Sequence, residues 1–213
     1  MASLFPPALT ILCLLFASSP PPPSPNGDSN NGVGQDGITS KMAPVIEARD
    51  KASSLTLKGK NKEAVMWYED AIWLGRRIVL DGTKNDGSMD QSDREGDVAL
   101  EMLVELYASS AWNRLAIPDI DGARREAWAA CVHSQNIAGD DNDEINAART
   151  IKAGAHIVLA AVCRAGDDPI GEKEALRNLL QLLAEGDDWD SVVGDGTTDE
   201  VTKSADSVKT RID

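Results

Sequence analysis

The chain from residue 44 to residue 186 carries a helical pattern throughout, and this feature restricts the fold more than any other. The stretch is rich in Ala, Leu and Glu, and it contains no run of alternating β-branched residues that would indicate a strand. The helices come in pairs, and helix breakers separate the two members of each pair. These breakers are Gly59, Pro118 with Gly122, and residues 166–171. The sequence therefore predicts an all-α domain of three helical hairpins.

The expected helices follow from these breakers. They run over about residues 44–58, 62–80, 98–117, 123–137, 143–164 and 172–185. Between the first two hairpins, residues 81–97 have no apolar face and are expected to form a mobile loop. We expect the tryptophans of the helical block to pack in the core and between hairpins; they are Trp67, Trp73, Trp112 and Trp128.

Two segments of different composition flank the helical block. Residues 1–41 contain an apolar run, a proline run and a Gly/Asn-rich stretch, and residues 187–213 are acidic with few apolar side chains. A segment of low hydrophobicity and high charge cannot bury enough apolar surface to fold. We therefore expect an N-terminal extension at 1–41, a helical domain at 42–186 and a disordered tail at 187–213.

The apolar run at residues 8–17 is too short to cross a bilayer, and it leaves two alternatives open. Residues 1–24 act as a secretory signal, or they form an extension without that function. No Lys or Arg precedes the run and Pro20 follows the best cleavage pattern, and both features count against a signal. Cys131 and Cys163 have no disulfide-framework spacing, so they indicate free buried thiols in a reducing compartment. We expect a cytoplasmic protein, with the secretory pathway as the alternative.

Charge and residue types exclude several classes of function. The chain has 21 Lys and Arg against 35 Asp and Glu, a net charge of −14, so we expect neither nucleic-acid binding nor strong membrane binding. Two His and three Cys are too few for a typical structural zinc site. His133 and His156 lie in helical segments far from any Gly-flanked Ser or Cys, and the sequence has no phosphate-binding loop or nucleophile elbow. We therefore expect no enzymatic activity and no cofactor.

Small residues recur in the first hairpin at the spacing that close packing of stacked hairpins requires. They are Ala52, Gly59, Ala64 and Ala71, with the aromatic Tyr68 between the last two. On these residues the segment 52–74 resembles a tetratricopeptide repeat. The resemblance extends over residues 44–186, and it implies stacked antiparallel helical hairpins, a tetratricopeptide-like (TPR-like) α-solenoid.

Two registers align the second hairpin with the first. One register places Gly122 at the turn glycine and then matches Ala127, Cys131 and Ser134. The other register matches Ala111, Ala123, Ala127 and Ala130. In the third hairpin the matching residues are Gly166, Ala175, Leu179 and Leu182. The sequence leaves the choice between the two registers open.

The resemblance implies a binding site as well as a fold. An array of this kind has a concave groove, lined by the first helix of each hairpin, that takes up an extended or helical peptide. In the clamp-type members of the family, which are co-chaperones, groove residues hold the C-terminal carboxylates of heat-shock chaperones. The matching positions here are Arg49, Ser53, Asn113, Lys152 and His156.

Three of these positions keep the chemistry of the clamp and two do not. Asn113 and Lys152 match the residue types of the family and Arg49 keeps the positive charge, whereas Ser53 and His156 depart from the pattern. We therefore expect a non-catalytic scaffold that binds a protein or peptide, and the resemblance implies a heat-shock chaperone C-terminus as partner. Two alternatives stay open. Arg49 and Lys152 are ordinary solvated charges, or the chain is a secreted or membrane-associated helical repeat protein that mediates assembly.

Overall fold

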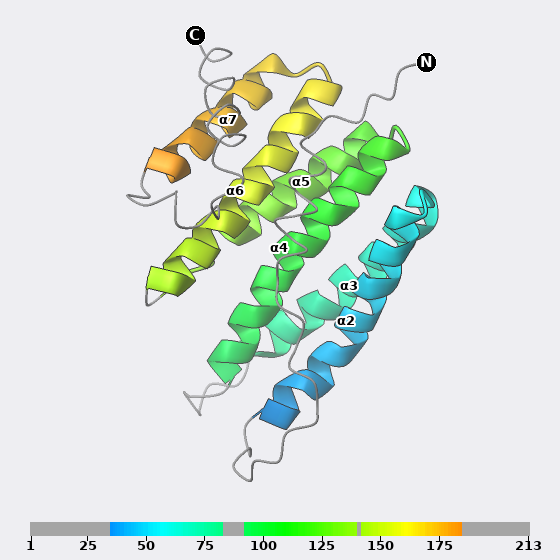
Figure 1. Cartoon of the computed structure of the whole chain (residues 1–213), viewed down its shortest axis with the longest axis vertical. Coiled ribbons are helices and arrows are strands. Elements are labelled where there is room, and N and C mark those ends of the chain that lie inside the picture. The colour runs from blue at the N-terminus through cyan, green and yellow to red at the C-terminus, as the bar shows by residue number, and fades with distance from the viewer. Residues whose placement is uncertain (1–34, 83–91, 140–141, 185–213) are drawn as a thin grey trace. The chain divides into compact units, whose positions relative to one another are not determined.

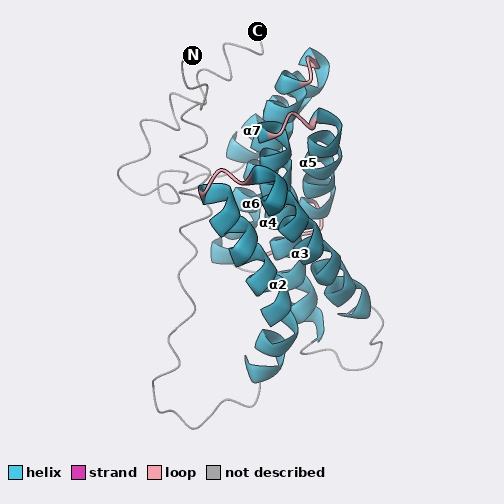
Figure 2. Cartoon of the chain, turned by 90° about the vertical axis from the view of Figure 1, so that its right-hand side faces the viewer, coloured by secondary structure: helices cyan, strands magenta, loops and turns pink. Residues whose placement is uncertain are grey.

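The structure is a computed structural model of the whole chain, and it describes residues 35–82, 92–139 and 142–184. The chain divides into two compact units, Met1–Ser40 and Lys41–Asp213. The predicted signal at 1–24 and the predicted tail at 187–213 lie outside the described residues. Within the described residues the chain forms helices and turns and contains no strand (Figure 2).

The described residues form the helices α2 (Gln35–Leu57), α3 (Asn61–Gly82), α4 (Ser92–Ala116), α5 (Ile120–Ser134), α6 (Asn142–Ala165) and α7 (Pro169–Ala184) (Figure 1). The predicted all-α class is therefore confirmed for this part of the chain. None of these helices combines the length and the apolar composition that a bilayer span requires.

Two predicted helix starts are wrong by six residues or more, and α5 and α7 each begin three residues before their predicted start. α2 begins at Gln35, so Pro44 lies inside the helix and not in its first turn. Because proline has no backbone N–H, the helix has one backbone hydrogen bond fewer at this position. α4 begins at Ser92, so the last residues of the predicted loop are helical, while residues 83–91 lie outside the described residues. An apolar face marks only the turns of a helix that pack against a neighbour, and the first turn of α4 therefore carries no signal in the pattern.

Neighbouring helices pack against each other along the chain. α3 packs on α4, α4 on α5, α5 on α6 and α6 on α7, and α4 also contacts α6. α2 joins this group through two side-chain hydrogen bonds: Ser53 to Tyr68 of α3, and Thr56 to Asn113 of α4. The first helices of the three hairpins, α2, α4 and α6, are therefore connected in succession.

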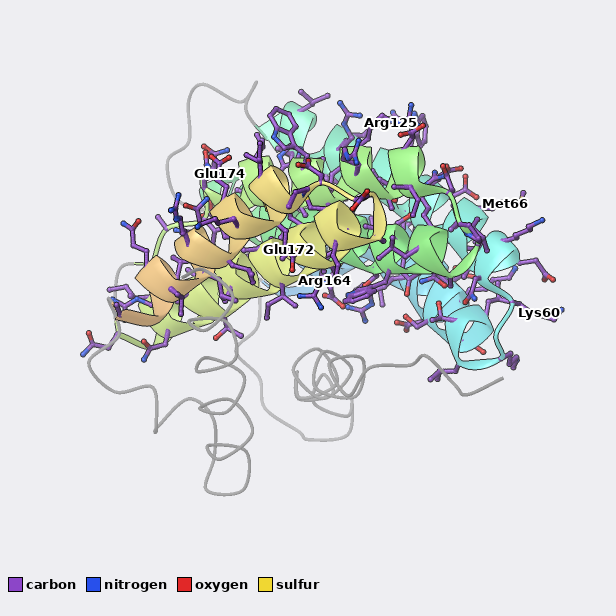
Figure 3. The ribbon with its side chains drawn as sticks, turned by 90° about the horizontal axis from the view of Figure 1, so that it is seen from above. Lys60, Met66, Arg125, Arg164, Glu172 and Glu174 are labelled. Atoms are coloured by element: carbon purple, nitrogen blue, oxygen red, sulfur yellow. The ribbon has the colours of Figure 1, made fainter. Side chains whose placement is uncertain are left out.

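The turns within the three hairpins have the same backbone hydrogen bonds. In each turn the last residue donates its N–H to the carbonyl five residues earlier, from Lys60 to Leu55, Asp119 to Arg114 and Asp168 to Cys163, at 2.9, 2.9 and 2.8 Å. The residue before it has a positive φ, which is 70° at Gly59, 29° at Pro118 and 54° at Asp167. This left-handed residue followed by a bond back into the helix is a common way to end a helix. Across the third turn, Arg164 and Glu172 face each other (Figure 3) and form an ion pair at 2.7 Å.

These equivalent turns decide between the two registers. Counted from the turn residues Lys60, Asp119 and Asp168, the eighth and eleventh residues are buried in every hairpin; they are Tyr68 and Ala71, Ala127 and Ala130, and Leu176 and Leu179. The register that matches Ala111, Ala123, Ala127 and Ala130 therefore agrees with the structure. The register with Gly122 as the turn glycine is wrong, because Gly122 lies inside α5. The place of Asn113 in the predicted clamp depends on that register and therefore loses its basis. In the third hairpin the prediction is shifted by three residues, since Leu176 and Leu179 occupy the places assigned to Leu179 and Leu182.

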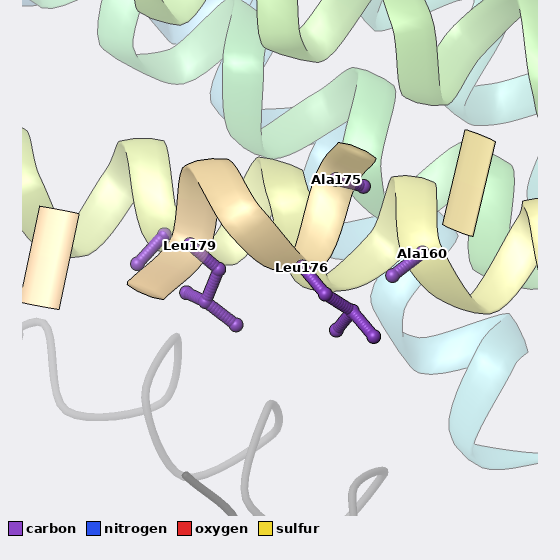
Figure 4. Close-up of a cluster of buried hydrophobic side chains, with 5 residues drawn as sticks. Ala160, Ala175, Leu176 and Leu179 are labelled. Atoms are coloured by element: carbon purple, nitrogen blue, oxygen red, sulfur yellow. The ribbon is translucent and has the colours of Figure 1, made fainter. Parts of the chain in front are cut away.

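Alanines let α6 and α7 approach closely. Ala153 and Ala160 of α6 pack with Ala175, Leu176 and Leu179 of α7 in one buried cluster (Figure 4). The alanines keep the helix surfaces flat at the contact, and the leucines fill the space beside them. Small residues therefore allow close helix packing in this hairpin, as the sequence predicted, but most of the residues at the contact differ from the predicted ones.

Candidate functional site

Asn113, one of the predicted peptide-binding residues, connects two helices. Its side chain is 3% exposed. The amide oxygen accepts a hydrogen bond from Thr56 of α2 at 2.9 Å, and the amide nitrogen donates to the carbonyl of Ser109 at 2.8 Å. The amide thus satisfies groups inside the fold, because a buried polar group needs partners.

Ser53 and His156 also have partners within the fold. The Ser53 hydroxyl lies 3.3 Å from the Tyr68 hydroxyl, which joins α2 to α3. His156 Nδ1 lies 3.7 Å from Cys131 Sγ, between α6 and α5. Burial lowers the pKa of His156 and raises the pKa of Cys131 to about 12. Both groups are therefore neutral at pH 7, and this Cys–His pair lacks the thiolate that a nucleophile requires.

The two predicted cations lie on different helices. Arg49 of α2 forms an ion pair with Asp50 at 3.0 Å, and its side chain is 29% exposed. Lys152 is half-buried on α6. Within the described residues, no hydrogen bond or ion pair joins any two of the five predicted residues. The structure thus places them on α2, α4 and α6, and the carboxylate clamp stays a prediction.

Carboxylates accompany these cations. Burial raises the pKa of Glu105 on α4. The charge of Arg49 lowers this pKa and the charge of Asp50 raises it, and both effects are smaller than that of burial. Burial also raises the pKa of Glu101, with further contributions from the charges of Asp97 and of Glu144 on α6. A ligand carboxylate approaching Arg49 would therefore meet the carboxylate of Asp50 beside the cation, and Glu105 close by.

A cluster of charges that the sequence did not predict surrounds Arg114 of α4. Its side chain is 13% exposed and forms ion pairs with Glu69 of α3, with Asp119 in the turn and with Glu126 of α5, the last at 2.8 Å. The Asp119 carboxylate also accepts the N–H of Gly122 at 3.0 Å and so caps α5. Arg114 therefore joins three helices, and its single positive charge is shared by Asp119 and the two glutamates.

Those two glutamates line a cleft between α3, α4 and α5 with a volume of about 450 Å³. Its lining residues are Glu69, Ile72, Trp73, Arg76, Arg77, Leu80, Tyr107 and Glu126. Trp73 and Leu80 are each 58% exposed, which corrects the prediction that Trp73 packs in the core. Trp128 of α5 is likewise exposed, at 63%, whereas Trp67 and Trp112 are half-buried.

The cleft contains charges with and without an ion-pair partner. Glu69 and Glu126 are paired with Arg114, whereas no carboxylate among the described residues pairs with Arg76 or Arg77. Arg77 lies over the Trp73 ring, 5.0 Å from its centroid, and Arg76 donates a hydrogen bond to Tyr107. The cleft therefore presents two guanidinium groups beside exposed apolar surface, which suits a ligand with carboxylates and an apolar side chain.

Within the described part of the chain, no three His, Cys, Asp or Glu side chains come together as a metal site. One feature of the sequence marks this surface. Met66, Trp73 and Leu80 are apolar and lie seven residues apart, so they share one face of α3. All three are exposed, whereas a periodic apolar face predicts burial.

Comparisons with known proteins found no relative of this chain. No protein-family model matches the chain, and no similar curated protein and no similar solved structure was found. The resemblance to the tetratricopeptide family is therefore neither confirmed nor refuted.

Proposed function

We propose that this chain is a non-catalytic scaffold of stacked helical hairpins, a TPR-like α-solenoid, that binds a peptide segment of another protein. Two observations support the solenoid. The three hairpin turns share their backbone hydrogen bonds, and the first helices contact one another in succession, α2 with α4 and α4 with α6. Stacked repeats bury their apolar faces only against neighbouring repeats, which produces this order of contacts.

The observation that carries the binding function is the cleft between α3, α4 and α5. Arg76 and Arg77 have no carboxylate partner in the described residues and lie beside the exposed Trp73 and Leu80. Each guanidinium can form a charge-assisted hydrogen bond with a ligand carboxylate, worth roughly 1.5 to 3 kcal/mol. Tryptophan and arginine are also the residues that contribute most often to binding energy in interfaces. The preferred ligand is therefore a peptide with acidic residues beside an aromatic or aliphatic one.

Selection from a displayed random-peptide library against the full chain tests this function. We expect enriched peptides to combine Asp or Glu with an aromatic or aliphatic residue, and Arg77→Glu to weaken their binding about tenfold or more. Arg125→Glu is the matched control, because Arg125 is exposed on α5 and does not line the cleft. Enriched peptides that bind Arg77→Glu as well as the unchanged chain would contradict the proposal.

The co-chaperone version of the scaffold predicts a different binding site. It places a ligand C-terminus at Arg49 and Lys152, so an amide cap on the peptide or Lys152→Ala should abolish binding there. Binding in the cleft needs side-chain carboxylates and should tolerate both changes. Titrating one acidic peptide with a free and with an amidated C-terminus therefore separates the two sites.

A further inference from the structure

The cleft between α3, α4 and α5 specifies what its occupant must contain. Arg76 and Arg77 require carboxylates, and the exposed Trp73 and Leu80 require an apolar side chain close to those carboxylates. The occupant must carry few basic residues, because the cleft already presents two guanidinium groups.

One segment of this chain outside the described residues has this composition. Residues 187–193, Asp-Asp-Trp-Asp-Ser-Val-Val, combine three acids, one tryptophan and two valines without a base. Residues 1–34 contain one acid, residues 83–91 contain no aromatic residue, and the acids of residues 199–213 alternate with Lys203, Lys209 and Arg211. Residues 187–193 are therefore the segment whose acidic and apolar side chains match the cleft.

The chain is too short here for this segment to reach its own cleft. α7 ends at Ala184 and packs on α6, α6 packs on α5, and α5 forms one wall of the cleft. Packed helices lie about 8 to 10 Å apart, and the contacts lead from α7 through α6 and α4 to α3, the helix of the arginines, in three such steps. Asp187 and Asp188 follow Ala184 by three and four residues, which span at most about 14 Å when fully extended.

We infer that residues 187–193 of one molecule occupy the cleft between α3, α4 and α5 of a second copy of this chain. This inference rests on the proposed binding function of the cleft. Asp187 and Asp188 pair with Arg76 and Arg77, and Trp189 packs against Trp73 and Leu80. Because the two contacting surfaces differ, the association is head-to-tail, and each copy keeps one free cleft or one free tail for the next.

Sedimentation velocity of the full chain over a wide concentration range tests the inference. We expect the sedimentation coefficient of the unchanged chain to rise with concentration. Two variants should each remain monomeric: Arg77→Glu, which alters the cleft, and the double substitution Asp187→Lys with Asp188→Lys, which alters the tail. Arg125→Glu should associate like the unchanged chain, because Arg125 lies outside the cleft lining.

Mixing the two monomeric variants gives the decisive measurement. The Arg77→Glu chain has an intact tail and the Lys variant has an intact cleft, so an equimolar mixture should associate although neither variant does so alone. An unchanged chain that stays monomeric at every concentration, an Arg77→Glu chain that still associates, or a mixture that does not pair would overturn the inference. Peptide selection by the cleft does not depend on the tail, so these outcomes leave the proposed function standing and the two failures are distinguishable.

Discussion

Replacing Gly59 by alanine isolates the cost of the left-handed backbone in the first hairpin turn. Gly59 has a φ of 70°, and a Cβ at this position would meet no atom within 4 Å. The effect of the substitution therefore comes from the backbone alone. An L-residue in this conformation costs roughly 1 to 2 kcal/mol, and the reduced freedom of the unfolded chain offsets about 0.4 to 1 kcal/mol. We expect Gly59→Ala to lower the free energy of unfolding by about 1 kcal/mol.

Gly96 provides the matched control. It lies within α4, and a Cβ there would also meet no atom within 4 Å. Alanine is favoured over glycine inside a helix by roughly 0.5 to 1 kcal/mol, so Gly96→Ala should raise the free energy of unfolding. The two substitutions add the same methyl group to open space and should differ by about 1.5 to 2 kcal/mol with opposite signs. Gly59→Asn should cost less than Gly59→Ala, because asparagine tolerates the left-handed region.

Urea denaturation of the full chain, followed by far-UV circular dichroism, measures these changes. The slope of the free energy against urea should be the same for all variants, so a shift in midpoint reports stability. If Gly59→Ala stabilised the chain as Gly96→Ala does, the left-handed turn would be refuted, and with it the equivalence of the three hairpin turns.

Three further predictions concern groups buried or bonded in the hairpins. Ala64 is fully buried, so Ala64→Leu should lower the urea midpoint by an amount equal to about 1 to 3 kcal/mol through overpacking, and an unchanged midpoint would contradict its placement. The Gly122 N–H and Arg114 hold the pKa of Asp119 below 3.8, so its stabilisation is present above that pH and is lost as the pH falls through the folded-state pKa. The stability difference between the unchanged chain and Asp119→Asn should therefore shrink in acid, and a constant difference would argue against the cap. Burial raises the pKa of Cys131 to about 12, so mass spectrometry should find it unmodified by iodoacetamide at pH 8 in the native chain and alkylated in urea.

The hairpin arrangement could be predicted from the sequence because apolar periodicity and helix breakers report packing and helix ends directly. The register could not be predicted for an equally physical reason. A shift by one helical turn replaces Ala123, Ala127 and Ala130 of α5 by Ala127, Cys131 and Ser134. All of these side chains are small, so both registers satisfy the small-residue pattern. Only the backbone hydrogen bond from Asp119 to Arg114, which the sequence does not contain, shows where the turn lies.

The predicted binding residues illustrate a second limit. Residue type and spacing matched Asn113 to the clamp of a known family, but they do not report what else is close to it. Thr56, which is 57 residues earlier, accounts for the amide oxygen, and the carbonyl of Ser109 accounts for the amide nitrogen. Trp73 shows the same limit, because the sequence predicted it to be buried and the structure leaves it exposed. An apolar residue on a helix indicates a buried face only where another element covers it.

The pairing of charges in the cleft depends on a residue that does not line it. Two arginines and two glutamates line the cleft, and a count by residue type alone gives no net charge. Arg114 keeps this balance, because it pairs with Asp119 as well as with Glu69 and Glu126, but it decides which of the lining charges have a partner. Its glutamate partners lie 45 residues before and 12 residues after it in the chain, beyond the spacing at which helical ion pairs can be recognised in a sequence. The group that holds α3, α4 and α5 together thus leaves Arg76 and Arg77 without a carboxylate partner among the described residues, and the proposed peptide binding rests on these two groups.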